Sequence, residues 1–153
     1  MSWMYKEFSE LTGYEVYEIL KLRVAVFVVE QECPYYEVDG NDYDAVHVSY
    51  MDEKGIAAYT RLLPEGVKYE EPSIGRVIVR QDLRGTGLAN KIMEHAVHYI
   101  VEEWQAEKIR LQAQTHLANF YGKHGFKAIS EPYLEDGIPH VDMFYHNTAK
   151  KSF

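Results

Sequence analysis

Hydrophobic residues recur along the chain either at every second position or at the three- to four-residue spacing of a helix. The change from one spacing to the other divides the sequence into strands and helices. A weakly alternating run from Trp3 to Phe8 predicts a first strand, and apolar residues at helical spacing predict a helix that ends near Glu30. Apolar and β-branched runs predict further strands over 45–51, 55–62, 73–80, 108–114, 126–130 and 140–146. Helices are predicted over 86–105 and 116–123. The expected order is β-α-β-β-β-α-β-α-β-β.

The segment from Glu32 to Asp44 interrupts this pattern. It contains Cys33-Pro34, Gly40-Asn41 and a group of acidic residues, and it is longer than a simple connection requires. Long loops of this kind usually bind something, so we expect it to flank a binding cleft.

Composition and charge narrow the class of protein. The chain has 153 residues, the size of one domain, and its 16 Lys and Arg against 24 Asp and Glu give a formal net charge of -8. An acidic protein is a poor partner for nucleic acid or an anionic membrane, so a cationic small molecule is the favoured ligand. A single cysteine, Cys33, excludes an internal disulfide. The start of the chain lacks a secretory signal and no apolar run is long enough to span a bilayer, so we expect a cytoplasmic protein.

Metal and cysteine chemistry are not expected. His95 and His98 share a helix face, but no acidic or cysteine ligand stands at a recognised spacing from them. Cys33 precedes Pro34 without an evident His/Asp arrangement, which favours a packed thiol over a nucleophile.

The most informative stretch is RVIVRQDLRGTGLANKIM, residues 76–93, in which an apolar strand leads through Gly85 and Gly87 into an amphipathic helix. Glycines can adopt backbone angles closed to other residues, and the first N–H groups of a helix lack intrahelical partners. This arrangement predicts an anion site, and a diphosphate is the favoured ligand.

Three other interpretations of the glycine turn can be compared with its sequence. A P-loop requires four residues between its glycines and then Gly-Lys-Ser/Thr, which Gly85-Thr86-Gly87-Leu88 lacks. A dinucleotide fold requires a third glycine in a parallel βαβ series, but Asn90 stands at that position. The third is a plain strand-to-helix turn.

The same stretch resembles the central motif of the GNAT superfamily of N-acetyltransferases, whose pattern Gln/Arg-x-x-Gly-x-Gly/Ala falls on residues 82–87. Asp82 departs from that pattern; because an acid would repel diphosphate, we expect it to turn away or to interact with nearby backbone N–H groups. ANFYGKHGF, residues 118–126, resembles the superfamily's C-terminal helix motif. With LKLRVAVFVVEQECPYYEVDGNDYDAVHV, TRLLP and EDGIPHVDM, nearly the whole chain is similar to the ElaA-type acetyltransferases.

The resemblance implies one GNAT domain over residues 1–153 with an α/β (α+β) fold, a mixed and mostly antiparallel sheet of six to seven strands flanked by about four helices. It implies acetyl-CoA as co-substrate, attacked directly by a primary amine in a ternary complex. The residues that would hold the donor are Ile78, Val79, Arg84, Gly85, Thr86, Gly87, Leu88, Ala89 and Asn119. Among them, Arg84 would add charge toward phosphate, and Ile78 and Val79 would pair with the pantetheine arm.

Catalytic roles follow from the same resemblance. Tyr121 would protonate the departing thiolate, unless it is only a core aromatic with an exposed tip, and the Val79 N–H would stabilise the oxyanion. His140 is our preferred general base, because its ordinary pKa suits proton transfer near neutrality. The candidate acceptor-binding residues are Glu37, Asp39, Asp42, His47, Asp136 and His140, and together their acids would attract a cationic amine.

Two alternatives remain open from the sequence. RVAVFVVEQ and RLLP also resemble acyl-homoserine-lactone synthases, although the glycine turn favours free coenzyme A as donor. A non-catalytic acyl-CoA sensor is the other. The acceptor, a small or peptidic amine, is not identified by the sequence, and a homodimer is a default expectation.

Overall fold

The computed structural model describes residues 2–147, and its elements follow the predicted order with one additional strand. The strands are β1 (Ser2–Glu7), β2 (Val46–Asp52), β3 (Gly55–Leu63), β4 (Ser73–Val79), β5 (Lys108–Gln114), β6 (Phe126–Ala128), β7 (Tyr133–Glu135) and β8 (Ile138–His146). The α-helices are α1 (Gly13–Val24), α2 (Leu88–Glu102) and α3 (Ala118–Gly122). Strand β7 is the element that the sequence pattern missed.

Helix α1 begins where the sequence supplies a capping box. The Thr12 hydroxyl accepts from the Glu15 N–H at 3.1 Å, and the Glu15 carboxylate accepts from the Thr12 N–H at 2.9 Å. The single helix expected to reach Glu30 is an α-helix that continues as a π-helix over Ala25–Glu30. Its Ile19 packs against Tyr59 and Ile78, so α1 covers one face of the sheet.

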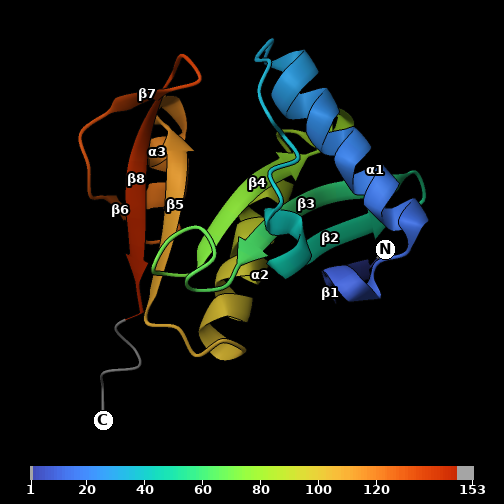
Figure 1. Cartoon of the computed structure of the whole chain (residues 1–153), viewed down its shortest axis with the longest axis horizontal. Helices are drawn as coiled ribbons and strands as arrows, with labels where there is room; N and C mark the ends of the chain where they lie inside the picture. Colours follow the sequence, from blue (N-terminus) through green and yellow to red (C-terminus); the bar gives the residue numbers. More distant parts are fainter. Residues whose placement is uncertain (1, 148–153) are drawn as a thin grey trace.

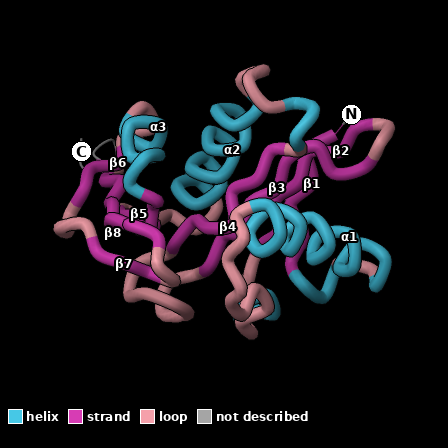
Figure 2. The backbone as a smooth tube through the Cα atoms, turned by 90° about the horizontal axis from the view of Figure 1, so that it is seen from above, coloured by secondary structure: helices cyan, strands magenta, loops and turns pink. Residues whose placement is uncertain are grey.

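Helix α2 covers the opposite face, together with α3 (Figure 2). The apolar stripe predicted for this helix is its buried side: Leu88, Ile92, Met93, Ala96 and Ile100 are buried, and Val97 and Trp104 pack against the same core. The two helical layers thus enclose a mixed sheet, as the GNAT resemblance implies.

The eight strands lie in the order β1-β2-β3-β4-β5-β8-β6, with β7 paired to β8. All neighbouring pairs are antiparallel except β4 and β5, which are parallel and paired in register at Ser73 and Arg110. Beyond that point the two strands diverge (Figure 1). The sheet therefore opens into a wedge, and its closed end lies near Ser73 and Arg110.

Candidate active site

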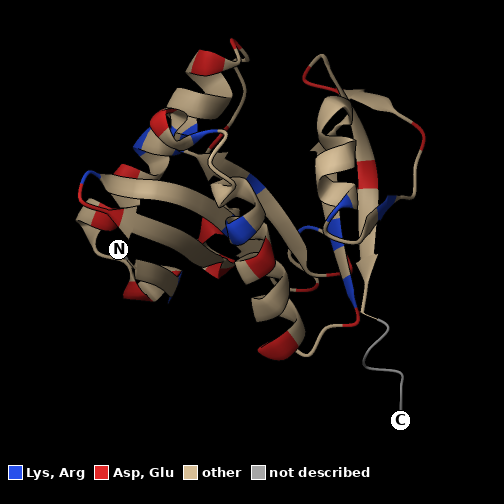
Figure 3. Ribbon diagram, turned by 180° about the vertical axis from the view of Figure 1, so that it is seen from behind, with Lys and Arg blue, Asp and Glu red and all other residues tan. Residues whose placement is uncertain are grey.

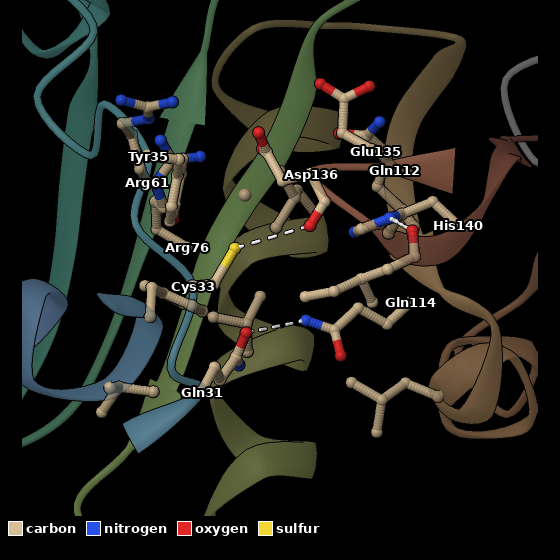
Figure 4. A pocket seen from close by; sticks show the side chains of 18 of the residues that line it. Gln31, Cys33, Tyr35, Arg61, Arg76, Gln112, Gln114, Glu135, Asp136 and His140 are labelled. Carbon is tan, nitrogen blue, oxygen red and sulfur yellow. Dashed lines mark hydrogen bonds between the residues drawn. The ribbon is translucent and has the colours of Figure 1, made fainter. Parts of the chain in front are cut away.

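A cleft of about 600 Å³ fills the wedge between β4 and β5. One wall consists of the π-helix, the loop that follows it, and β4. The other wall consists of β5, the turn between β7 and β8, and the start of α3. Figure 4 shows Tyr35, Arg61 and Arg76 on the first wall facing Gln112, Glu135 and His140 on the second.

The glycine turn lies beside one end of the cleft and leaves the start of α2 uncapped. Gly85 and Gly87 have φ angles of +82° and +88°, the left-handed region that their sequence predicts. Gly87 occupies the N-cap position, no side chain caps the helix, and the first turn holds no acidic residue. The Thr86 hydroxyl donates to the Leu83 carbonyl at 2.6 Å rather than capping α2. The positive end of the helix is therefore free to bind an anion.

The residues of the glycine turn differ in which of their atoms a ligand can reach. Gly85, Thr86 and Gly87 are exposed, whereas the Leu88 side chain is buried in the core, so Leu88 can offer a ligand only its backbone. Ala89 is half-buried. The predicted diphosphate site is thus built from N–H groups rather than from side chains.

Arg84 does not point over the glycine turn. Its guanidinium binds both oxygens of Glu30 at 2.9 and 3.0 Å, and its Nε donates to the Val79 carbonyl at 3.2 Å. The expectation that Arg84 directs its charge at a phosphate group is therefore not met in this arrangement, because Glu30 from the π-helix already neutralises it.

Asp82 turns away from the turn, as expected, but its main partner is a side chain. It accepts from Arg80 Nε at 2.7 Å, and Arg80 also binds Asp52. The hydrogen bond from Arg80 lowers the pKa of Asp82. The acid is thus neutralised by a neighbouring cation instead of facing a bound anion.

Two residues of β4, Ile78 and Val79, are predicted to contact the donor through their backbone, and only Val79 directs its N–H into the cleft. The Arg80 N–H donates to the Ala57 carbonyl at 2.8 Å, so Ala58 and Val79 form a non-hydrogen-bonded pair. The N–H of Val79 is therefore directed to the opposite edge of β4, where the wedge is open. By the same alternation, the backbone of Ile78 is directed to β3.

Ile78 is consequently an incorrect assignment as a donor-binding residue. Its side chain is 2% exposed and packs beneath α1, and its backbone polar groups face a neighbouring strand. Its packing against α1 helps to hold in place the strand that carries Val79.

Tyr121 lines the cleft from α3, whereas Asn119 lies on the exposed side of that short helix. The ring of Tyr121 packs edge-on against Phe120 at 5.1 Å. Burial raises the pKa of Tyr121 to about 12, so the phenol is protonated throughout the neutral range. Asn119 is not among the lining residues, and the expected contact with pantetheine has no support in its position.

The acidic loop after the π-helix does not form a free acidic wall. The Arg23 guanidinium donates to Glu37 at 2.6 Å and to Asp42 at 2.5 Å, and all three side chains are buried or nearly so. Burial disfavours the charged form of Asp42, but the hydrogen bond and charge of Arg23 outweigh that cost and lower its pKa. Glu37 and Asp42 are therefore held in a salt-bridge network, which contradicts their assignment to acceptor binding.

Asp39 is similarly engaged, although it lines the cleft. Arg61 binds both of its oxygens at 2.9 Å, and Arg76 approaches to 3.5 Å while binding Glu37 at 2.7 Å. Arg61 offsets the desolvation of Asp39 and holds the pKa of that carboxyl well below its usual range. Three arginines thus match three carboxylates on this wall, and Figure 3 shows basic and acidic positions interspersed over both halves of the sheet.

His47 lies outside the cleft. Its ring is 3% exposed and bonds to the Tyr59 hydroxyl at 2.7 Å and to the Asp42 carbonyl at 3.0 Å. Burial lowers its pKa, so it is a neutral core histidine and its assignment to acceptor binding was wrong.

The second wall contains the predicted residues Asp136 and His140. His140 Nδ1 lies 2.7 Å from the Ile138 carbonyl, which can only accept, so Nδ1 carries a proton and Nε2 is the nitrogen with a lone pair when the ring is neutral. Asp136 occupies a tight turn with a φ of +52°, and its carbonyl accepts from the Cys33 thiol at 3.7 Å. A second contact across the cleft joins Gln114 Nε2 to Gln31 Oε1 at 3.2 Å (Figure 4).

Several lining residues were not singled out from the sequence: Val26, Phe27, Gln31, Lys68, Tyr69, Gln112 and Gln114. The alternation in β5 was the available signal, because Ile109, Leu111 and Ala113 are apolar and buried while Gln112 and Gln114, on the other face, line the cleft.

Over residues 2–147, the structure places no three His, Cys, Asp or Glu side chains where they could hold a metal ion. In the same part of the chain, no helix has the length and apolar character needed to cross a membrane.

Comparison with known proteins identifies the family. A model described as an acetyltransferase (GNAT) domain matches residues 15–146. The protein ElaA of Escherichia coli (strain K12) is 40% identical over 145 residues, covering 94% of this chain and 95% of ElaA. The crystal structure of E. coli ElaA has a TM-score of 0.89 at 39% identity, covering 95% of this chain and 99% of that one. An acyl-CoA N-acyltransferase from Pseudomonas aeruginosa has a TM-score of 0.88 at 42% identity with the same coverage. This chain belongs to the GNAT acetyltransferase family and is a homologue of ElaA.

Proposed function

We propose that this protein transfers an acetyl group from acetyl-CoA to a primary amine by direct attack within a ternary complex. The observation that carries the proposal is the open wedge beside β4, which combines an outward-facing Val79 N–H with the uncapped start of α2. The P. aeruginosa relative is an acyl-CoA N-acyltransferase, which supports the same donor class.

The donor is proposed to bind from the glycine turn inward. Backbone N–H groups from Gly85 through Ala89 would hold the diphosphate, because no side chain caps α2 and no acid lies in its first turn, whereas the Arg84 N–H donates to the Gln81 carbonyl at 3.3 Å. The pantetheine arm would then extend along the open edge of β4 at Val79, in the place that a neighbouring strand would occupy. This path ends in the cleft that Tyr121 lines.

The chemistry requires few side chains. The neutral amine attacks the thioester carbon, and the Val79 N–H stabilises the negative charge that develops on the carbonyl oxygen. The new C–N bond forms, the C–S bond breaks, and the proton lost by the amine passes to Nε2 of His140. Tyr121 donates its proton to the departing thiolate and recovers one from solvent, and His140 releases the proton that it took from the amine to solvent.

A thiol-release assay on polyamines, aminoglycosides, amino acids and peptides tests this proposal. We expect thiol release that requires both acetyl-CoA and an amine. Saturable acetyl-CoA binding with no thiol release on any of these amines would favour an acyl-CoA sensor.

A further inference from the structure

Strand β5 places one polar side chain close to the closed end of the wedge. The parallel pairing of β4 and β5 is at Arg110, and Gln112 lies two residues further along the strand, on the same face and lining the cleft. Two residues of strand span about 7 Å. Gln112 therefore lines the inner part of the cleft, near its closed end.

Hydrogen bonds behind Gln112 fix the orientation of its amide. The Tyr133 hydroxyl donates its single proton to Asp142, so it can only accept from Gln112. Gln112 therefore turns Nε2 toward that hydroxyl, at 2.9 Å, and its Oε1 is left as the atom directed elsewhere. The orientation of the amide follows from the chemistry of its partners.

We call the hydrogen-bonded chain from Gln112 through Tyr133 to Asp142 the relay, and further contacts hold it in place. Asp142 also accepts from Arg110 at 2.5 Å, and its backbone N–H donates to the Ser130 hydroxyl at 3.0 Å. The guanidinium of Arg110 lies 4.6 Å from the centre of the Tyr69 ring. Tyr133 in β7, Asp142 in β8 and Arg110 in β5 thus hold the Gln112 side chain in one geometry, which is the requirement for a precise binding group.

The two walls differ in the groups that they offer a ligand. On the first wall, Arg61 and Arg76 are engaged by carboxylates of the loop after the π-helix. On the second wall, Gln112 Oε1 and His140 Nε2 are hydrogen-bond acceptors, and the exposed carboxylates of Glu135 and Asp136 lie at its rim. A ligand group bound at the second wall must therefore be a donor.

From this juxtaposition we propose that Gln112 binds the amino group of the acceptor, with its Oε1 accepting an N–H hydrogen bond and with Tyr133 and Asp142 as positioning residues. The proposal rests on the proposed acetyl transfer and specifies the substrate class of the same site: an unhindered amine that enters as a hydrogen-bond donor and carries positive charge before deprotonation. A neutral carbonyl oxygen accepts an N–H hydrogen bond from the ammonium and also from the neutral amine that remains after deprotonation.

Steady-state kinetics on Gln112→Met, Gln112→Glu and Tyr133→Phe test this assignment, with spermidine, L-lysine and trialanine as amine probes. Methionine has the length of glutamine without its polar atoms, so Gln112→Met should raise the KM for the amine about tenfold and leave the KM for acetyl-CoA unchanged. Gln112→Glu keeps an acceptor oxygen but loses the N–H that donates to Tyr133, so it should raise the KM for the amine about threefold, less than Gln112→Met. Tyr133→Phe frees the amide to rotate and should raise the KM for the amine about fivefold.

Tyr36→Phe is the matched control, since Tyr36 lines the same cleft but is 91% exposed and lies outside the relay. It should leave both KM values unchanged. Equal KM values for the amine in wild type and Gln112→Met, with turnover intact, would overturn the assignment. A rise in both KM values would also overturn it, because it would show a general structural defect.

NMR spectroscopy, which needs no catalysis, tests amine binding by Gln112 separately from acetyl transfer. The side-chain amide protons of Gln112, identified in NMR spectra by their absence from Gln112→Met, should exchange slowly in wild type and faster in Tyr133→Phe. Adding 10 mM spermidine, about the range of a weak substrate, should shift them. If no probe is acetylated but the amide shifts as expected, the proposed function fails and the amine site stands. If acetylation occurs and the amide neither shifts nor changes its exchange, the amine site fails alone.

Discussion

A charge placed at Gly87 should separate donor binding from folding. Gly87 is exposed, has a φ of +88°, and an added Cβ meets no atom within 4 Å. Asp and Asn both tolerate left-handed backbone better than other residues and have nearly the same size. Gly87→Asp and Gly87→Asn therefore share any backbone strain and differ in charge alone.

The carboxylate of Gly87→Asp should stabilise the fold and weaken the binding of acetyl-CoA. An acid at the N-terminus of α2 interacts favourably with the helix dipole, so Gly87→Asp should be more stable than Gly87→Asn by about 0.3–1 kcal/mol. A carboxylate about 4 Å from one phosphate charge costs about 1 kcal/mol in water and about 4 kcal/mol near a protein surface. For an exposed loop we take the lower half of that range, about 1–2.5 kcal/mol, which predicts that Gly87→Asp binds acetyl-CoA about 5- to 70-fold more weakly than Gly87→Asn.

Isothermal titration with acetyl-CoA and urea unfolding measure the two effects on the same samples. The difference in affinity should shrink as salt rises from about 0.05 to 0.5 M, because exposed charges are screened. Gly66 offers a matched control, with a φ of +83° and the same open surroundings. Gly66→Asp and Gly66→Asn should bind the donor equally. Equal donor affinities for the two Gly87 variants would refute the diphosphate assignment.

Three further changes probe other parts of the account. Tyr121→Phe should lower kcat while acetyl-CoA affinity stays within about twofold; equal losses of both would show that Tyr121 is only structural. The raised pKa of Tyr121 favours its protonated form in the folded state, so its contribution to stability is complete below pH 10 and is lost as pH rises from 10 toward about 12. The free energy of unfolding should accordingly fall more steeply in wild type than in Tyr121→Phe over that range, and parallel curves would contradict the stated burial. Arg23→Met leaves Glu37 and Asp42 as buried charges without their shared partner and should cost about 3–5 kcal/mol in urea unfolding, whereas a loss below about 1 kcal/mol would show that the network can rearrange.

Local sequence signals account for the frame of the molecule. The capping box at Thr12 and Glu15 fixes the start of α1, and the apolar spacing in α2 fixes the face that it buries. The glycine turn was predictable because only its glycines fit left-handed backbone next to a helix start. These features depend on residues within one or two turns of each other.

The partners of the carboxylates in the acidic loop could not be predicted from nearby residues. Its carboxylates could equally have faced solvent or substrate, and their partners lie elsewhere in the chain, with Arg76 39 residues beyond Glu37. Only the packing of α1, β3 and β4 brings these arginines to the loop. The sequence interpretation identified an acid-rich loop correctly and assigned its charge to the wrong partner.

Strand register decided two other assignments. Which of Ile78 and Val79 faces the open edge depends on the irregularity near Arg76, where the register between β3 and β4 shifts and φ is +54°. The three-residue strand β7 was missed because it is too short to show alternation and Leu134 is exposed. Asp136-Gly137, which closes the β7–β8 hairpin, was its only strong signal.

The fate of a labelled acetyl group tests the central claim most directly. The protein is mixed with [1-14C]acetyl-CoA and an accepted amine for a single turnover, and the label and the free thiol are counted. Direct attack predicts one labelled amide for each thiol released and no label on the protein. Label retained covalently by the protein, for instance at Cys33 in the cleft wall, or thiol release without a labelled amide, would contradict the account.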